Sequence, residues 1–240
     1  MRRSTTVSTI FTDELIDRSP IHVPAGVYPP QEDSALLVDA LRTSGRAAGS
    51  RIADLCSGSG VVALAAAEQG AASVAAFEMS PVAVSCARRN AAATGLDVKV
   101  HRGSWTRAVE FEAFDVVTCN PPYVPFDDGA DEAVVPDEAG PATAWNAGRD
   151  GRRILDPLCE RAPEMLVDGG TIFIVHSEFA DVDRTVDGLR AAGLRAQVVA
   201  QRWIPFGPVL TARAQWLERI GLLEVGRRRE RLAVIRGDRS

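Results

Sequence analysis

The segment best suited to chemistry is Asn120-Pro121-Pro122-Tyr123, which follows the apolar run Phe114–Cys119. Two consecutive prolines fix the backbone and remove two N–H donors, so we expect a strand to end here in a stiff loop. The Asn120 side-chain oxygen and the Pro121 carbonyl can both accept hydrogen bonds from one planar NH₂ group, against which the Tyr123 ring can pack. This arrangement suits methylation of an amide or exocyclic amine, because it orients the nitrogen and stabilises the charge that develops on it. The alternative is an ordinary turn, since Asn-Pro is a common turn dipeptide.

A second candidate site begins at Asp54 and reads DLCSGSG as far as Gly60. Gly58 and Gly60 permit a tight turn and close approach of a ligand to the backbone. Glu78 lies 20 residues beyond Gly58, and a carboxylate at that place can accept hydrogen bonds from both hydroxyls of a ribose. Both S-adenosylmethionine (SAM) and NAD fit this pattern. Asp54 favours SAM, because an acid there can pair with the cationic amino-acid part of that molecule but would repel a pyrophosphate.

Hydrophobic periodicity predicts the elements that position these two segments. Short apolar runs alternate with longer amphipathic ones, which is typical of an α/β protein with a mostly parallel, doubly wound sheet. We expect seven strands, the last of them antiparallel, at Arg51–Cys56, Ser73–Glu78, Val98–Arg102, Phe114–Cys119, Thr171–His176, Leu194–Ala200 and Arg231–Arg236. The helices are expected at Gln31–Ser44, from the glycine turn to Gln69, and at Pro81–Thr94, Arg149–Met165, Phe179–Ala192 and Leu210–Ile220. In such a sheet the ligand lies beyond the carboxyl ends of the strands, where both candidate segments fall.

Composition narrows the classes of function. The 240 residues contain 27 Lys+Arg and 32 Asp+Glu, a net charge of −5, which weighs against a protein that grips duplex DNA. The four cysteines form no CxxC pair and no cluster with the three histidines, so no metal site is predicted. No apolar run is long enough for a signal peptide or a membrane span. We therefore expect one cytoplasmic domain over residues 1–240, with an N-terminal extension (1–26) and an insert (201–223) before the last strand.

Taken together, these motifs resemble a class I SAM-dependent methyltransferase, and more narrowly the HemK/PrmC family of protein N5-glutamine methyltransferases. The similarity is greatest to the short form of that family, which lacks an N-terminal helical domain. Besides the glycine segment, Glu78 and the NPPY segment, the resemblance rests on VYPPQEDS at 27–34, on Trp105, and on WNAGRDG at 145–151. It covers about residues 27–200 and the final strand.

The resemblance implies a function and a set of site residues. The activity would be transfer of a methyl group from SAM to the side-chain amide of glutamine in a protein such as a peptide-chain release factor. The catalytic segment would be Asn120, Pro121, Pro122 and Tyr123. The cofactor would be bound by Tyr28, Glu32, Ser34, Asp54, Cys56, Ser57, Gly58, Gly60, Glu78, Met79, Ser104, Trp105 and Asn120.

Two departures from the family pattern bear on the substrate. The acid that usually precedes the tryptophan is Ser104 here, so the contact to the adenine amine is expected to be weaker or different. The 201–223 segment, with Trp203, Phe206 and Trp216, is longer than the corresponding connection and either covers the substrate cleft or docks an extra helix. An acidic run from Asp127 to Glu138 directly follows NPPY; it is either solvated surface or a lid for a cationic substrate.

Other functions remain open at this point. NPPY is shared with adenine-N6 and guanine-N2 methyltransferases of nucleic acids, whose bases present the same planar amine. A small metabolite is a further candidate acceptor, because the aromatic insert could close a pocket. Outside methyl transfer, the glycine segment also permits an NAD-dependent oxidoreductase or a SAM-binding module without activity.

Overall fold

The apolar runs form one seven-stranded sheet in the structure, a computed structural model that describes residues 21–127 and 135–240. The strands are β1 (Arg51–Leu55), β2 (Ser73–Glu78), β3 (Val98–Arg102), β4 (Phe114–Cys119), β5 (Leu166–Ser177), β6 (Arg195–Pro205) and β7 (Arg229–Asp238). Their order is β3-β2-β1-β4-β5-β7-β6. Strands β1 to β5 pair in parallel, and β7 is antiparallel to both β5 and β6. The predicted mostly parallel α/β sheet with an antiparallel last strand is confirmed.

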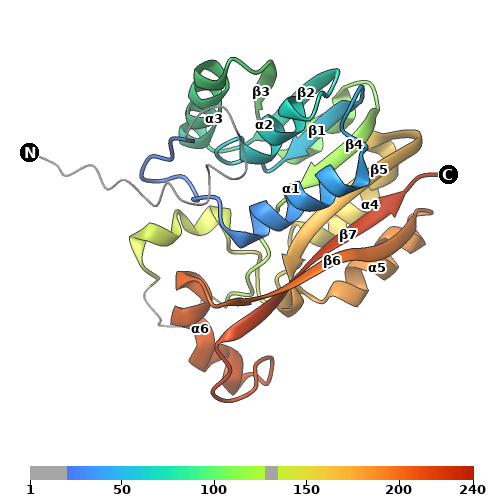
Figure 1. Ribbon diagram of the computed structural model, residues 1–240. Coiled ribbons are helices and arrows are strands. Elements are labelled where there is room, and N and C mark those ends of the chain that lie inside the picture. Colours follow the sequence, from blue (N-terminus) through green and yellow to red (C-terminus); the bar gives the residue numbers. More distant parts are fainter. Residues whose placement is uncertain (1–20, 128–134) are drawn as a thin grey trace, which may run out of the picture.

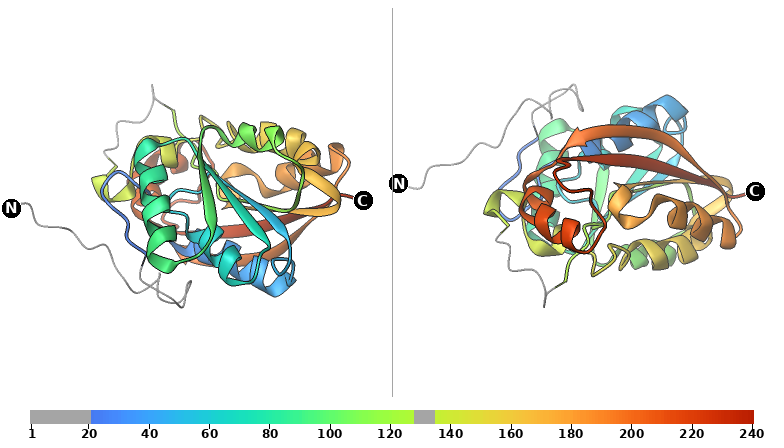
Figure 2. Two further views of the ribbon diagram at one scale, coloured as in Figure 1. Left: turned by 90° about the horizontal axis from the view of Figure 1, so that it is seen from above. Right: turned by 90° about the horizontal axis from the view of Figure 1, so that it is seen from below.

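Helices cover both faces of the sheet (Figure 2). On one face lie α1 (Glu32–Ser44), α2 (Val61–Glu68) and α3 (Pro81–Thr94), whose buried side chains share a core with the strands. On the other lie α4 (Leu155–Met165), α5 (Val182–Ala191) and a 3₁₀ helix at Trp105–Glu110. The sheet reverses its winding between β1 and β4, because β1 pairs with β2 on one side and β4 on the other. The carboxyl ends of these strands form the crevice in which such sheets bind ligands.

The last helix, α6 (Pro208–Arg219), lies apart from both layers, at one end of the β6–β7 pair (Figure 1). The sequence placed an insert at 201–223, but its first five residues continue strand β6, since Gln201–Pro205 pair with Ala233–Arg229 of β7. Strand β6 was predicted to end at Ala200 and is therefore longer than expected. The wrong boundary has a physical reason: the side chains of this half of the strand alternate between half-buried and exposed, so no continuous apolar run marks it.

Two helices begin clearly later than predicted. The helix expected from Arg149 begins at Leu155, because Gly148 and Gly151 adopt positive φ and Asp150 accepts a hydrogen bond from the Arg152 N–H in a turn. The helix expected from Phe179 is a 3₁₀ turn at Glu178–Ala180, followed by α5 from Val182. Asp181 separates the two at φ 60°, and its carboxylate caps α5 by accepting a hydrogen bond from the Arg184 N–H.

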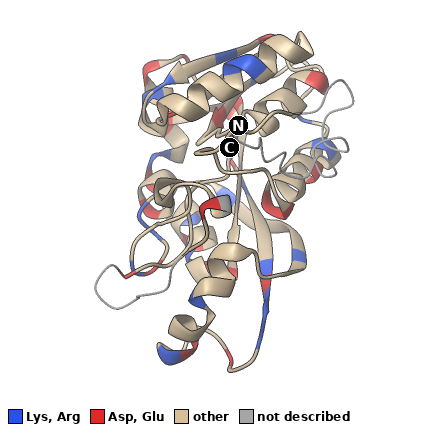
Figure 3. Cartoon of the chain, turned by 90° about the vertical axis from the view of Figure 1, so that its left-hand side faces the viewer, with Lys and Arg blue, Asp and Glu red and all other residues tan. Residues whose placement is uncertain are grey.

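Charged residues of both signs are interspersed over the elements (Figure 3). Helix α3 differs, because its charged residues are the two arginines Arg88 and Arg89. Among the described helices, none combines the length and apolar character needed to cross a membrane. Of the predicted N-terminal extension, residues 1–20 lie outside the described part of the chain. The segment that follows them packs against α3, where Asn90 hydrogen-bonds the backbone N–H and carbonyl of His22.

Candidate functional site

The two candidate segments lie in the same cavity of about 640 Å³, a volume within the range of small-molecule and cofactor sites. The carboxyl ends of β1, β2 and β4 form its floor, the N-terminal turn of α1 one side, and the start of β7 with α6 another. All the catalytic candidates line it, as do all the cofactor-binding candidates except Gly60: Tyr28, Glu32, Ser34, Asp54, Cys56, Ser57, Gly58, Glu78, Met79, Ser104, Trp105 and Asn120–Tyr123. The topology therefore brings together residues separated by almost a hundred positions.

The glycine turn is held by Glu78. One carboxylate oxygen of Glu78 accepts a hydrogen bond from the Gly58 N–H at 2.8 Å, and the other accepts one from the Ser80 N–H at 2.7 Å. Cys56 and Gly58 have φ of 55° and 54°, the left-handed backbone that a tight turn over a strand end requires. Glu78 thus has a structural role that sequence reasoning missed, and each of its oxygens keeps a second lone pair for a ligand hydroxyl.

Gly60 does not line the cavity. It caps the start of α2 at φ 86°, and a Cβ on it would lie 3.1 Å from the Cβ of Ala87 in α3. The residue therefore serves the close approach of α2 and α3. The expectation that Gly60 contacts the cofactor directly finds no support in this geometry.

Asp54 lies at the end of β1 and is 1% exposed. Its carboxylate accepts hydrogen bonds from the hydroxyls of Ser57 at 2.6 Å and Thr118 at 2.8 Å. Burial nevertheless raises the pKa of Asp54 to about 6, because desolvation of the charge outweighs these hydrogen bonds, and Glu78 adds a smaller repulsion. At neutral pH the group is an anion at the floor of the cavity.

The NPPY loop is fixed to the start of α1. The Nδ2 of Asn120 donates a hydrogen bond to the Ser34 hydroxyl at 3.4 Å. The hydroxyls of Tyr123 and Tyr28 both donate to Oδ2 of Asp33, at 3.1 and 3.4 Å. Burial, followed by the charge of Asp33, raises the pKa of both tyrosines well above the usual value, so both keep their protons. Asp33 was not among the predicted site residues, although its place between Glu32 and Ser34 in the VYPPQEDS segment was a signal for it.

The segment after NPPY is supported by the WNAGRDG stretch. The Val124 N–H donates to the Trp145 carbonyl at 2.8 Å, and the Ala147 N–H donates to the Val124 carbonyl at 3.1 Å. A Cβ at Gly151 would lie 2.5 Å from the Tyr123 carbonyl oxygen, so only glycine permits this approach. The second glycine of the stretch therefore positions the catalytic segment.

Helix α6 closes one end of the cavity with Pro208, Val209 and Leu210. It is anchored by Arg213, which is fully buried and has its guanidinium carbon 3.9 Å from the ring centre of Phe126 and 5.0 Å from that of Trp145. Both rings lie next to the end of the NPPY loop, since Phe126 follows Tyr123 by three residues and the Trp145 carbonyl accepts a hydrogen bond from the Val124 N–H. Of the aromatic residues of the insert, Phe206 and Trp216 pack in the cluster that holds α6, whereas Trp203 is 48% exposed, and none of the three lines the cavity. The aromatic residues that dock a helix are therefore Phe206 and Trp216.

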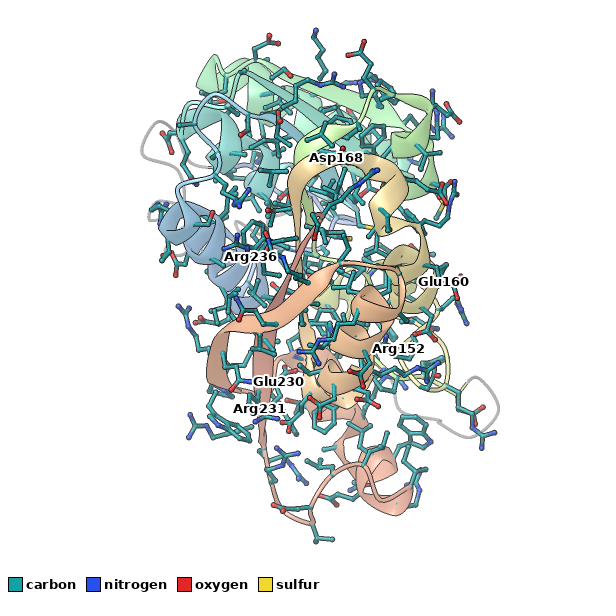
Figure 4. The ribbon with its side chains drawn as sticks, turned by 90° about the vertical axis from the view of Figure 1, so that its right-hand side faces the viewer. Arg152, Glu160, Asp168, Glu230, Arg231 and Arg236 are labelled. Atoms are coloured by element: carbon teal, nitrogen blue, oxygen red, sulfur yellow. The ribbon has the colours of Figure 1, made fainter. Side chains whose placement is uncertain are left out.

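The same end of the cavity contains Glu230 from β7, which sequence analysis also missed. Figure 4 shows Glu230 and Arg231 as neighbours on this strand, at its end nearer α6. Glu230 is 5% exposed. Burial raises the pKa of Glu230 to about 7, with smaller contributions from the negative charges of Asp33 and Glu178.

The remaining candidates differ in exposure. Trp105 is 7% exposed in the cavity wall, whereas Met79 is 64% exposed at its edge. The Ser104 hydroxyl accepts a hydrogen bond from the Thr106 N–H at 3.3 Å, so it caps the 3₁₀ helix. Of the acidic run, residues 128–134 lie outside the described part of the chain; Asp127 pairs with Arg149 at 3.2 Å. Among the described residues, no group of three or more His, Cys, Asp or Glu is placed to bind a metal.

The sequence of this chain is similar to those of known methyltransferases. The family described as the methyltransferase small domain matches residues 21–135. A relative from Methanocaldococcus jannaschii, which carries the name "Putative protein N5-glutamine methyltransferase", is 28% identical over 188 residues, covering 78% of this chain and 91% of the relative. The release factor glutamine methyltransferase of Deinococcus radiodurans is 37% identical over 177 residues, or 72% of this chain; the match covers 61% of that longer protein.

A solved structure gives the same fold. The Mtq2–Trm112 complex of E. cuniculi, described as responsible for methylation of the translation termination factor eRF1, matches with a TM-score of 0.60. The match covers 90% of this chain and 99% of the compared chain, at 20% sequence identity.

Proposed function

Because this chain belongs to the SAM-dependent methyltransferases, we propose that it transfers the methyl group to the side-chain amide of a glutamine in a protein. The observation that carries the proposal is the hydrogen bond from the Asn120 Nδ2 to Ser34. Since the NH₂ group of Asn120 is engaged there, its Oδ1 is the atom left to accept a hydrogen bond from an acceptor amide. The Pro121 carbonyl supplies the second acceptor, on a backbone that two prolines hold rigid.

The residues of the cavity fit SAM. Glu78 presents carboxylate lone pairs to the ribose hydroxyls, Trp105 supplies an apolar wall for the adenine, and Asp54 supplies an anion for the ammonium group. When bound, SAM provides an electrophilic methyl group on a sulfonium. The NAD alternative lacks support, because Asp54 would repel a pyrophosphate and the matched family uses SAM.

The protein's part in the reaction is to hold and orient a nitrogen that is a poor nucleophile. Two acceptors, Asn120 Oδ1 and the Pro121 carbonyl, bind the two N–H bonds of the amide and aim its nitrogen. They also stabilise the positive charge that develops on the nitrogen, and no strong base is needed because the methylated nitrogen becomes acidic. Asp33 and Ser34 act as positioning residues, since they hold Tyr123 and Asn120 by hydrogen bonds.

We propose a protein of the translation apparatus, such as a peptide-chain release factor, as the partner, which would place the reaction in the cytoplasm. The support is the Deinococcus radiodurans relative, which is named as a release factor glutamine methyltransferase and of which the match covers 61%. Duplex DNA fits less well, because the net charge is −5. The bases of RNA and small metabolites remain as acceptors that the following experiment distinguishes.

The proposal is tested with SAM carrying a labelled methyl group, the purified protein and an extract from cells lacking this methylation. The products are treated separately with protease, with nuclease and by size filtration. Label released only by protease and mapped to a glutamine supports the proposal and identifies the partner. Label released by nuclease, or found in the small-molecule fraction, contradicts it and assigns another acceptor.

A further inference from the structure

Glu230 is a buried carboxyl group at the end of the cavity that lies near α6. Its side chain is 5% exposed and lines the cavity. Within the described residues, its Oε2 has no hydrogen-bond partner. An unpaired buried acceptor costs free energy unless a partner supplies the missing donor. The group is thus built to receive a hydrogen bond from something that enters the cavity.

The neighbours of Glu230 cannot supply that donor. The Tyr28 and Tyr123 hydroxyls, from the segment before α1 and from the NPPY loop, donate to Asp33. Arg227, which precedes β7, forms an ion pair with Glu178 at 2.8 Å. Its charge also acts on Glu230, but its guanidinium makes no hydrogen bond to Oε2. Ser177 at the end of β5 contributes one hydrogen bond to the carboxyl group, and the charges of Asp33 and Glu178 are repulsive. The free oxygen is therefore an acceptor with two acidic groups near it, and it requires a donor from outside these neighbours.

The position of this donor follows from the other end of the site. Asp33 is the link, because it receives the hydroxyl of Tyr123 in the NPPY segment and also interacts electrostatically with Glu230. Asn120 and Glu230 also line the same cavity. When Asn120 holds the glutamine amide, the peptide groups next to that glutamine therefore lie toward β7.

We propose that Glu230 determines acceptor specificity, with its Oε2 accepting a hydrogen bond from an N–H group of the peptide that carries the methylated glutamine. This inference rests on the proposed function and adds a second point of recognition to it. The donor is either a main-chain N–H beside the glutamine or a cationic side chain, which share this chemistry.

The test compares the wild type with Glu230→Leu and Glu230→Gln, on a glutamine peptide at saturating SAM. We expect Glu230→Leu to raise the KM for the peptide by about 10- to 100-fold, the effect of one hydrogen bond to a charged group. The Kd for SAM should stay unchanged. Since the pKa of Glu230 is about 7, the wild-type KM should fall as pH rises through neutrality and the carboxylate forms. Glu230→Gln should abolish that pH dependence.

A second arm identifies the donor. Peptides in which single main-chain N–H groups are methylated, or single Lys or Arg residues replaced, are compared on wild type and Glu230→Leu. One such peptide change should raise the KM for the wild type but not for Glu230→Leu. The peptide change and the substitution each remove the same hydrogen bond, so the second change has no further effect. Asp238→Asn, at the other end of β7 and outside the cavity lining, is the control and should match the wild type in KM.

The outcomes separate the two claims. The role of Glu230 alone is overturned if the wild type methylates the peptide, Glu230→Leu has the same KM, and no peptide change affects the two enzymes differently. A wild-type enzyme that methylates no glutamine would overturn the proposed function together with this inference. Melting curves of all variants guard against misfolding, and Glu230→Gln keeps the test valid if the leucine variant fails to fold.

Discussion

The side-chain nitrogen of Asn120 donates a hydrogen bond to the hydroxyl oxygen of Ser34, 86 positions earlier in the chain, at 3.4 Å. This contact joins the NPPY loop to the first turn of α1. It fixes which end of the Asn120 amide remains available, because an amide presents an acceptor at one end and donors at the other. The orientation of the reacting nitrogen therefore depends on a residue from the segment before the sheet.

Ser34→Ala should lower kcat by about two- to tenfold, the effect of losing one neutral hydrogen bond that orients a catalytic group. The Kd for SAM should change by a smaller factor than kcat, because the lost hydrogen bond orients Asn120, which binds the acceptor amide. Steady-state kinetics and calorimetry measure the two quantities. Ser34→Thr keeps the hydroxyl and should recover most of the rate; a threonine variant as slow as the alanine variant would contradict the orienting role.

The affinity for SAM should depend on pH through Asp54. The carboxylate form pairs with the ammonium group, and the raised pKa of about 6 means that this form is lost as pH falls through that value. The Kd should therefore rise by up to about tenfold per pH unit below about 6 and stay level above it. Calorimetric titrations of the wild type and Asp54→Asn test this, since the asparagine variant should bind weakly with no such pH dependence. A wild-type Kd that is flat across this range would refute the pairing.

Glu78→Ala should weaken SAM binding by about 10- to 100-fold. It removes the acceptor for the ribose and also the two hydrogen bonds that hold the Gly58 and Ser80 backbone. Catalysis at saturating SAM should fall less than the affinity. Glu68→Ala, on α2 and outside the cavity lining, provides a matched control whose Kd should equal that of the wild type.

Arg213→Ala should destabilise the protein by about 2–4 kcal/mol, since it removes a desolvated cation from two aromatic rings and leaves a cavity. The loss should also raise the KM for the acceptor, because α6 forms the wall at that end. Denaturant unfolding measures the first effect and kinetics the second. Arg219→Ala, exposed on the same helix, should change neither.

The sequence predicted the parts of this site that lie in short, continuous segments. The glycine turn, Glu78 and NPPY could be identified because each follows an apolar strand, and parallel strands bring their carboxyl ends to one edge. Glu230 could not, because it lies in a basic stretch at the start of the last strand, and only the folded structure shows that it is buried at the end of the cavity. Arg213 was missed for a related reason: an arginine on a short helix predicts exposure, and the aromatic rings that it contacts, Phe126 and Trp145, lie far from it in the sequence.

The end of strand β6 could not be predicted from the sequence for a similar reason. The side chains of β6 beyond Ala200 alternate in exposure, so pairing with β7 determines the strand rather than an apolar pattern. This extension places α6 over the cavity, and it therefore decides the shape of the acceptor end.

The most direct test of the central claim is transfer of labelled methyl groups to a glutamine peptide by the wild type and by Asn120→Ala, with the product mapped by mass spectrometry. The label should lie on the side-chain nitrogen of one glutamine and disappear when that residue is glutamate. Asn120→Ala should cut the rate by about 10²-fold or more, the loss expected for one preorganised group, with SAM affinity within about tenfold. Undiminished transfer by Asn120→Ala, or label on any other atom of the peptide, would contradict the mechanism.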